Sequence, residues 1–346
     1  MANFRLLAAM DEEIEDELLL LSCYKDNSNS GDAFNFDELS AEACKKLFRF
    51  EKDDIPNLCT ALGIPDSFVC DSRTVCSGLE ALCLLLRRLT YPSRLSDLKS
   101  VFGRSVTAMS IIINTVLNFV YDAHNHLLHD LNSNWLSHRH LQEYADAIAA
   151  RDAPLLNCWG FIYGTVRPLC RPTTNQRILF NGHKRVHAIK FQSIVAPNGL
   201  VANMYGPIEG RRHDAGLLRE SGICGELQTH MTTPTGDIYV IYGDPAYPMT
   251  THIIKTFRGG VISAAQARFN KKISAVRTCV EWTFGKILTL FAFLDYKKNL
   301  KLYLQPVGKY YLVGTILVNC HTCLYGSETG HYFDIDPPSL ENYLSE

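Results

Sequence analysis

The segment His187–Tyr205, HAIKFQSIVAPNGLVANMY, decides the fold of this chain. Two β-rich runs, His187–Val195 and Leu200–Tyr205, flank the turn sequence Ala196-Pro197-Asn198-Gly199. Apolar and β-branched runs on either side of a turn that contains Pro and Gly predict an antiparallel hairpin. The hairpin therefore marks a β-containing region, which the neighbouring sequence extends in both directions.

Further strands and helices are predicted on both sides of the hairpin. The apolar runs Leu156–Val166 and Ile238–Tyr242 are typical of strands, and Ala215–Ser221 is typical of a short helix. A longer helix is predicted over Ser274–Leu290, because apolar residues recur at helical spacing at Ile273, Val276, Val280, Phe284, Ile287 and Phe291. Strands interleaved with helices predict a mixed-sheet α/β domain over residues 151–330.

The preceding region, residues 36–150, carries a helical pattern. One expected helix starts after an N-cap at Ser40. Two others cover Asp54–Leu62 and Ser77–Leu89. Residues 1–35 are acidic and polar and are expected to be flexible, and residues 331–346 form an acidic tail. The expected fold class is therefore α + α/β, with a helical region before the mixed-sheet domain.

One pair of predicted helices has the order of a helix-turn-helix unit. A short helix at Leu95–Phe102 and a turn at Gly103-Arg104-Ser105 precede a long helix from Val106 to about His129. The second helix is not basic and contains Ile111-Ile112-Ile113, which is unusual for a helix that reads DNA. An ordinary hairpin of a helical bundle therefore stays open as the alternative.

Charge is unevenly distributed along the chain. Residues 1–56 contain fourteen acids and six bases, a net charge of −8, so the remainder carries +6 within the total of −2. No carboxylate lies between Asp152 and Glu209 or between Asp244 and Glu281. Such basic stretches are typical of proteins that bind polyanions, although the acidic end could also balance them in space.

Two other classes of protein are disfavoured. No apolar run reaches about 18 residues, so no membrane span is predicted. The twelve cysteines are scattered, and Cys320-His321-Thr322-Cys323 is a single CxxC pair without the second pair that a structural zinc site needs. Reduced, mostly buried thiols are therefore expected.

Three carboxylates are candidates for chemistry. Asp244 follows a predicted buried strand, so it is expected at the carboxyl edge of the sheet, where sites in α/β proteins lie. Glu281 is expected beside the apolar stripe of the later helix, and the two acids could hold Mg²⁺ for phosphodiester chemistry. The alternatives are a turn aspartate before proline and an ion pair between Glu281 and Arg277. Asp214 is predicted to be an N-cap, with a metal or water contact as the alternative.

Many ordered motifs of the chain resemble the PIF/Harbinger transposase family and its host-adopted relatives over about residues 150–325. The matching segments are Gly160-Phe161-Ile162-Tyr163-Gly164-Thr165-Val166-Arg167, Cys170-Arg171-Pro172 with Gln176, Gly182-His183-Lys184-Arg185, Lys190-Phe191-Gln192, Gly206-Pro207, Gly210 with His213-Asp214, Gly243-Asp244-Pro245-Ala246-Tyr247-Pro248, Phe269-Asn270, Arg277, Val280-Glu281, Phe284-Gly285 and Asn319-Cys320-His321. The resemblance implies an RNase H-like fold and a nuclear DDE nuclease that uses two Mg²⁺ ions on transposon DNA. It also implies a separate Myb-like partner, and it leaves a cytoplasmic fraction open.

By resemblance, Asp244 is the second acid of the triad, Glu281 is the third, and Asp214 is a motif residue outside it. Tyr163 stands where the family has its first aspartate. A phenol is neutral at pH 7 and is a poor Mg²⁺ ligand, so catalysis is expected to be weak or absent. Tyr163 is expected beside Asp244, with Glu281 facing both.

Three functions remain open on the sequence. The first is a transposase-derived protein that binds DNA, with phosphate contacts expected from Arg167, Arg171, Lys184, Arg185 and Arg277. The second is an active metal-dependent nuclease that uses Asp244, Glu281 and Asp214. The third is a protein-binding scaffold without DNA contact.

Overall fold

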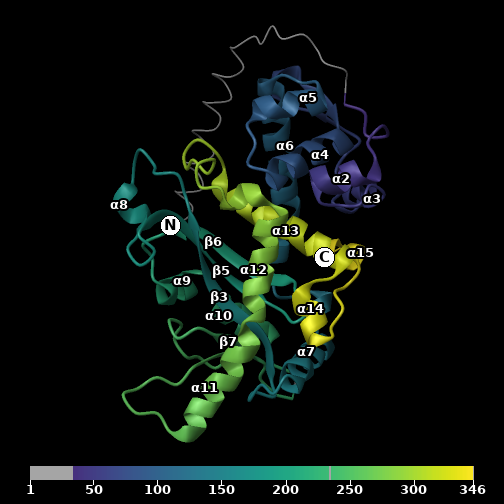
Figure 1. The fold of residues 1–346 in the computed structure, drawn as a ribbon. Helices are drawn as coiled ribbons and strands as arrows, with labels where there is room; N and C mark the ends of the chain where they lie inside the picture. The colour runs from purple at the N-terminus through teal and green to yellow at the C-terminus, as the bar shows by residue number, and fades with distance from the viewer. Residues whose placement is uncertain (1–33, 234, 346) are drawn as a thin grey trace. The chain divides into compact units, whose positions relative to one another are not determined.

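The computed structural model describes residues 34–233 and 235–345 of the chain (Figure 1). The acidic segment predicted at residues 1–35 lies almost entirely outside these ranges. The chain folds as two compact units, and each unit combines segments that are distant in sequence. The first unit takes the described part of residues 1–125 together with 168–176 and 287–317, and the second takes 126–167, 177–286 and 318–346.

The first unit is organised around α4 (Gly78–Thr90). Its run Leu82–Leu86 is completely buried, because a sequence without a polar face is stable only inside a core. The helices α2 (Ala41–Phe48), α3 (Asp54–Ala61) and α6 (Val106–His124) pack against it.

Serine residues cap two helices of this unit, at Ser40 as predicted and at Ser77, which was predicted as the first residue of its helix. The hydroxyls of Ser40 and Ser77 accept hydrogen bonds from the N–H groups of Ala43 and Glu80, each at 3.1 Å. A small antiparallel hairpin, β1 (Ser67–Val69) and β2 (Val75–Ser77), precedes α4. The 3₁₀ helices of the described chain are η1 (Asp71–Arg73), η2 (Leu95–Leu98), η3 (Asn125–Leu128), η4 (Asn134–Leu136) and η5 (Ala292–Asp295).

The predicted helix, turn and helix are present as α5 (Lys99–Phe102), Gly103 and α6. Gly103 ends α5 in the left-handed region, with φ 61°. However, α6 is a core helix, with Ile112 and Val116 fully buried and residues 106–110 buried or half-buried. A recognition helix must expose its first turns to DNA. The order of the elements is therefore confirmed, and a DNA-reading role for them is not.

The same helix passes a simple test for membrane spans. By length and composition alone, Val106–Leu128 could cross a membrane, in contrast to the expectation from the sequence. A buried core helix passes the same test, so the finding is weak.

The second unit contains a mixed sheet of six strands, β3 (Cys158–Pro168), β4 (Phe180–Asn181), β5 (Val186–Val195), β6 (Val201–Glu209), β7 (Val240–Gly243) and β8 (Ile253–Lys255). The predicted hairpin is confirmed, because β5 and β6 pair antiparallel. β7 pairs parallel with both β3 and β8. If the five strands other than β4 are numbered in chain order, their order in the sheet is 3-2-1-4-5. This mixed sheet is consistent with the RNase H-like fold that the resemblance implies.

The helix predicted over Ser274–Leu290 is two helices, α11 (Ala264–Arg277) and α12 (Cys279–Leu290), which meet at Thr278 (Figure 1). The Thr278 hydroxyl donates a hydrogen bond to the carbonyl of Ala275 at this break. The predicted apolar stripe is buried at all six positions. The other helices of the described chain are α7 (His138–Ala150), α8 (Gln176–Leu179), α9 (Asp214–Glu220), α10 (Ile223–His230), α13 (Val307–Tyr325), α14 (Glu328–Phe333) and α15 (Leu340–Leu344).

The C-terminal segment predicted as an acidic tail packs into the second unit. The ring of Phe333 stacks on Phe161, with centroids 6.2 Å apart. The Asn319 side chain donates to the Tyr343 hydroxyl at 2.9 Å and exchanges two hydrogen bonds with the backbone of Val201. Buried aromatic contacts therefore hold this segment in place, despite its acidic composition.

Candidate nuclease site and adjoining cavity

The strand register brings the first and second positions of the predicted triad to one edge of the sheet. Phe161 pairs with Tyr242 and Ile162 with Gly243, and Asp244 follows directly after β7 ends. Continuing this parallel register places the backbone of Asp244 opposite Tyr163. The sheet therefore puts Tyr163 where a first-strand carboxylate would adjoin Asp244.

Tyr163 is held by aromatic and cationic contacts. Its ring centroid lies 5.3 Å from that of Phe284 on α12, and the guanidinium carbon of Arg277 lies 5.8 Å from the Tyr163 ring centroid. Phe284 lies three residues after Glu281 on α12, whereas Arg277 is the last residue of α11, before the break at Thr278. Glu281 itself is exposed, and none of the ion pairs among the described residues joins it to Arg277.

A cavity of about 620 Å³ opens next to this edge. Asp214 and Asp244 both line it, whereas Glu281 and Tyr163 do not. The rest of its wall is mainly basic or glycine, with Gly164, Val166, Asn181, Gly182, His183, Lys184, Lys190, Gly210, Arg211, Arg212 and His213. Two of the three candidate acids therefore share one cavity, and Glu281 lies outside its lining.

Asp214 makes a specific ion pair instead of a helix cap. Helix α9 begins at Asp214, and His213 is the N-cap residue, so the predicted capping role of Asp214 is wrong. Asp214 Oδ1 accepts a hydrogen bond from Lys190 Nζ at 2.5 Å, and the Lys190 side chain is only 7% exposed. The Lys190 ammonium, buried on β5, attracts the carboxylate away from the helix end.

Gly164 separates Asp214 from Tyr163. A Cβ atom at Gly164 would lie 2.9 Å from Asp214 Oδ1 and 3.3 Å from the Tyr247 hydroxyl. Successive residues of a strand point to opposite faces of the sheet, so Tyr163 faces α12 and Gly164 faces Asp214. Asp214 therefore lies on the opposite face from Tyr163, which disfavours it as a substitute for the first acid.

Tyr247 has a buried hydroxyl beside these carboxylates. Burial raises the pKa of Tyr247 well above its usual value, and the charges of Asp214 and Asp244 raise it further. The hydroxyl is inaccessible and has no hydrogen-bond partner among the described residues. The Asp244 carboxylate already accepts a hydrogen bond at 2.7 Å from the N–H of Ala246, as a turn aspartate does.

These residues do not fit a two-metal centre. Two-metal sites hold ions roughly 3.5–4 Å apart with carboxylates that stabilise both charges. In this chain the residue predicted for the first position is a tyrosine whose ring lies beside the Arg277 guanidinium, and Asp214 is already paired with Lys190. Asp244 and Glu281 are the two candidate carboxylates that remain, and of these only Asp244 lines the cavity.

The predicted phosphate contacts differ in accessibility. Arg167 is only 8% exposed, and its guanidinium donates to Thr165 Oγ1 at 2.6 Å and lies over the Phe284 ring. This burial disfavours the predicted phosphate contact at Arg167. Lys184 and Arg185 are exposed at the turn between β4 and β5. Arg171, in the first unit, is exposed and donates to Gln176 Oε1.

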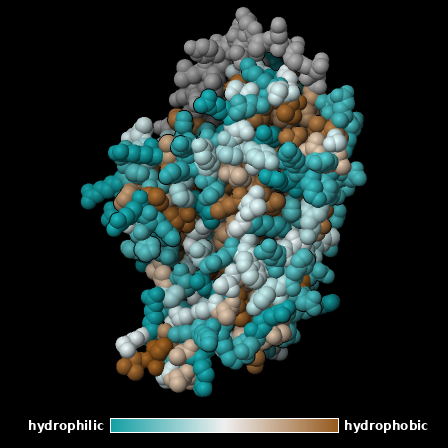
Figure 2. All heavy atoms as spheres, viewed as in Figure 1, coloured by the Kyte–Doolittle hydropathy of each residue, from teal (hydrophilic) through white to brown (hydrophobic). Residues whose placement is uncertain are grey.

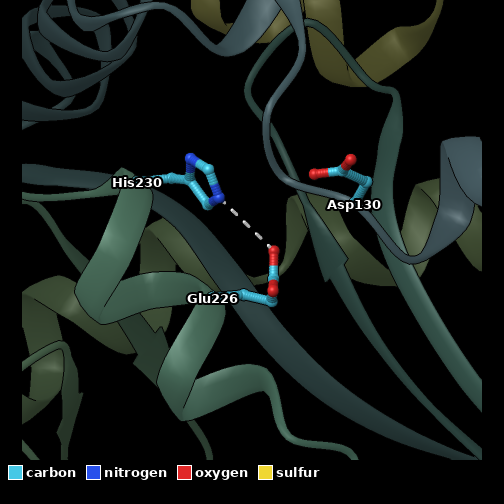
Figure 3. Close-up of side chains that lie close together, drawn as sticks. All are labelled: Asp130, Glu226 and His230. Atoms are coloured by element: carbon cyan, nitrogen blue, oxygen red, sulfur yellow. Dashed lines mark ion pairs between the residues drawn. The ribbon is translucent and has the colours of Figure 1, made fainter.

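One further group of possible metal ligands was not predicted from the sequence. Asp130, Glu226 and His230 place one ligand atom each within 4.8 Å of one another (Figure 3). Glu226 and His230 lie one turn apart on α10, with 3.7 Å between Glu226 Oε2 and His230 Nε2. Their i,i+4 spacing in the sequence indicates such a pair only if this segment is predicted to be helical. Exposed carboxylates often lie this close without an ion, so the group alone supports no metal assignment.

The CxxC pair lies on α13. Cys320 is buried on α13, and burial raises its pKa well above the usual value. Burial also raises the pKa of Cys323 to about 12. Both thiols are therefore protonated near neutral pH, which makes them poor nucleophiles.

The comparisons with known proteins agree with the mixed-sheet fold. Residues 162–319 match the family model of the DDE superfamily endonucleases. No curated protein and no solved structure matches the chain. Members of the matched family are generally dependent on divalent metal ions and act on DNA. The match supports a DDE transposase-like family for residues 162–319, with a transposase-derived, nuclease-like fold.

Proposed function

We propose that this chain is a Harbinger-type transposase-derived protein that binds DNA and has lost most of its nuclease activity. The observation that carries the proposal is the packing of Tyr163 against Phe284 and Arg277 at the position of the first acid. A carboxylate there would supply two oxygens that bind Mg²⁺ well, whereas a phenol supplies one oxygen that is a poor Mg²⁺ ligand.

DNA binding is supported by the accessible bases around the cavity. Lys184, Arg185 and Arg211 are exposed on the second unit, and no acid lies between Asp152 and Glu209. Arginine and lysine side chains bind phosphates through charge, with affinity that falls steeply as salt increases. A Myb-like partner and a nuclear location are part of the same proposal, and both rest on the resemblance.

The central experiment compares nicking of supercoiled DNA by the wild type and Tyr163→Asp, with Mg²⁺ or Mn²⁺ present. We expect little cleavage by the wild type and a gain in the variant, which Glu281→Gln should remove when the two changes are combined. Tyr163→Phe is the matched control and should behave like the wild type. Robust and equal cleavage by the wild type and Tyr163→Asp would contradict the proposal. Circular dichroism confirms that each variant is folded.

A second candidate function is an active divalent-metal nuclease. It is favoured by the presence of Asp214 and Asp244 in one cavity. In that case wild-type cleavage should be robust, and both Asp214→Asn and Glu281→Gln should abolish it. The pairing of Asp214 with Lys190 and its place on the opposite face of the sheet from Tyr163 make this the weaker candidate.

A further inference from the structure

A short segment before α11, Arg258–Ile262, exposes apolar side chains at the surface of the second unit. We call this segment the tip. Val261 is 96% exposed and Ile262 is 36% exposed. Figure 2 shows hydrophobic side chains gathered at its lower left, where Figure 1 draws the loop that leads into α11. Single exposed apolar residues are common, so the surroundings of the tip decide whether these side chains have a role.

The tip is fixed at both ends. On one side, the Asn270 side chain donates to the carbonyl of Phe257 and accepts from its N–H, both at 2.9 Å. The Phe257 ring also packs edge-on against Phe269, with centroids 5.2 Å apart. On the other side, Ser263 and Gln266 form a reciprocal capping box at the start of α11. Only five residues, including Gly259-Gly260, therefore lie between two anchored points.

The tip lies within a stretch that carries positive charge only. No acid occurs between Asp244 and Glu281. Lys272 is paired with Asp152 at 2.6 Å. The exposed bases here that join none of the ion pairs among the described residues are Arg258, Arg268 and Lys271. Arg268 and Lys271 lie three residues apart on α11, so they point to the same side of the helix.

We propose that the tip is a wedge that inserts Val261 and Ile262 into the minor groove of duplex DNA. Apolar side chains of minor-groove proteins enter between base steps and kink the duplex, while nearby bases hold the phosphates. The positive surroundings fit a polyanion, and the anchored base lets the side chains enter without first ordering a loop. This proposal rests on the proposed DNA binding and adds a DNA-bending activity to it.

The test uses the full chain and a duplex of about 30 base pairs with central TA steps and a fluorophore at each end. Energy transfer between the fluorophores reports bending, and anisotropy reports affinity. The variant V261S/I262S should bend the duplex much less and bind about tenfold more weakly, because it loses apolar burial. Its salt dependence should stay unchanged, because the phosphate contacts remain. The matched control is Val69→Ser on the β1–β2 hairpin, where Val69 is 78% exposed, and it should match the wild type.

The possible failures are distinguishable. If the wild type binds no duplex, the proposed function itself fails. If the wild type binds, and V261S/I262S binds and bends the duplex equally well, only the wedge is wrong. Loss of binding to phosphatidylserine vesicles, with DNA binding intact, would assign the tip to a membrane surface and overturn the proposal.

Discussion

The ring of Tyr163 packs against Phe284 at a centroid distance of 5.3 Å, and Phe284 lies less than one turn after Glu281 on α12. Strand β3 and helix α12 thus place Tyr163, the residue predicted for the first position of a triad, against the helix that carries Glu281, the residue predicted for the third. At this position the chain has an aromatic ring that contributes to packing. The Tyr163 ring is therefore part of the contact between α12 and the sheet.

This packing predicts how stability responds at Tyr163. Tyr163→Asp should lower the free energy of unfolding by about 2 kcal/mol, because it removes the half-buried ring contact with Phe284. Tyr163→Phe keeps the ring and should change the free energy of unfolding by less than about 0.5 kcal/mol. Urea denaturation followed by circular dichroism measures both. A Tyr163→Asp variant as stable as the wild type would show that the ring contact contributes little.

Removing Asp214 and removing Lys190 are expected to lower the free energy of unfolding by different amounts. Asp214→Asn leaves the Lys190 ammonium, 7% exposed, without its ionic partner and should cost about 3 kcal/mol of unfolding free energy. Lys190→Met leaves Asp214, which is 21% exposed and partly solvated, and should cost about 1–2 kcal/mol. Denaturation of both single variants and the double variant measures the coupling. The reverse order would mean that the aspartate is the more strongly desolvated partner.

Lys286 predicts a pH dependence of stability. Burial lowers its pKa to about 8 from 10.5, although its ammonium donates to Thr322 Oγ1 and to the Gly326 carbonyl. Between these pKa values the unfolded chain binds more protons at this residue than the folded protein. Its contribution to the free energy of unfolding should therefore rise as the pH rises from 8 to 10.5.

The contribution of Lys286 can be isolated with Lys286→Met. Buried cysteines and tyrosines titrate over the same range with the opposite sign, so the difference between the wild type and the variant is the useful quantity. That difference should move in favour of the wild type as the pH rises through the interval. A constant difference from pH 7 to pH 10 would show that Lys286 keeps an ordinary pKa.

Local patterns in the sequence predicted much of this fold. Ser40 and Ser77 cap helices because a short side-chain oxygen reaches the third N–H, which depends only on neighbouring residues. The apolar stripe from Ile273 to Phe291 is buried as predicted. The break at Thr278 was not predicted, because the apolar residues Val276 and Val280 keep helical spacing across it.

Long-range contacts explain what the sequence did not predict. Arg167 was expected at the surface, but it lies over Phe284, which is 117 positions later in the chain. Asp214 was expected to cap its own helix, but Lys190 on β5 binds it. The first unit likewise includes residues 168–176 and 287–317, held partly by the hydrogen bond from the Cys170 N–H to the Leu300 carbonyl. Such pairings depend on the fold, and no local pattern reports them.

A substitution at Arg104 tests whether the predicted helix-turn-helix unit reads DNA. The Arg104 guanidinium donates two hydrogen bonds to Glu80, at 2.5 and 2.8 Å, and these bonds raise the pKa of Arg104. Arg104→Gln should therefore lower the free energy of unfolding by about 1–3 kcal/mol and leave DNA affinity unchanged. Fluorescence anisotropy with duplex DNA measures the affinity at a temperature where the variant is folded. A clear loss of affinity would restore the DNA-reading role of the turn before α6.

In contrast to Arg104, the bases in the turn between β4 and β5 are expected to contribute to DNA affinity. The double variant K184Q/R185Q removes two exposed charges at and beside the cavity. It should weaken DNA binding at every duplex sequence and reduce the slope of log affinity against log salt by about 1 for each lost phosphate contact. Arg139→Gln is the matched control, because Arg139 is also exposed but is paired with Glu143 on α7, and its slope should stay at the wild-type value. An unchanged slope in K184Q/R185Q would mean that the DNA backbone follows another basic surface of the protein.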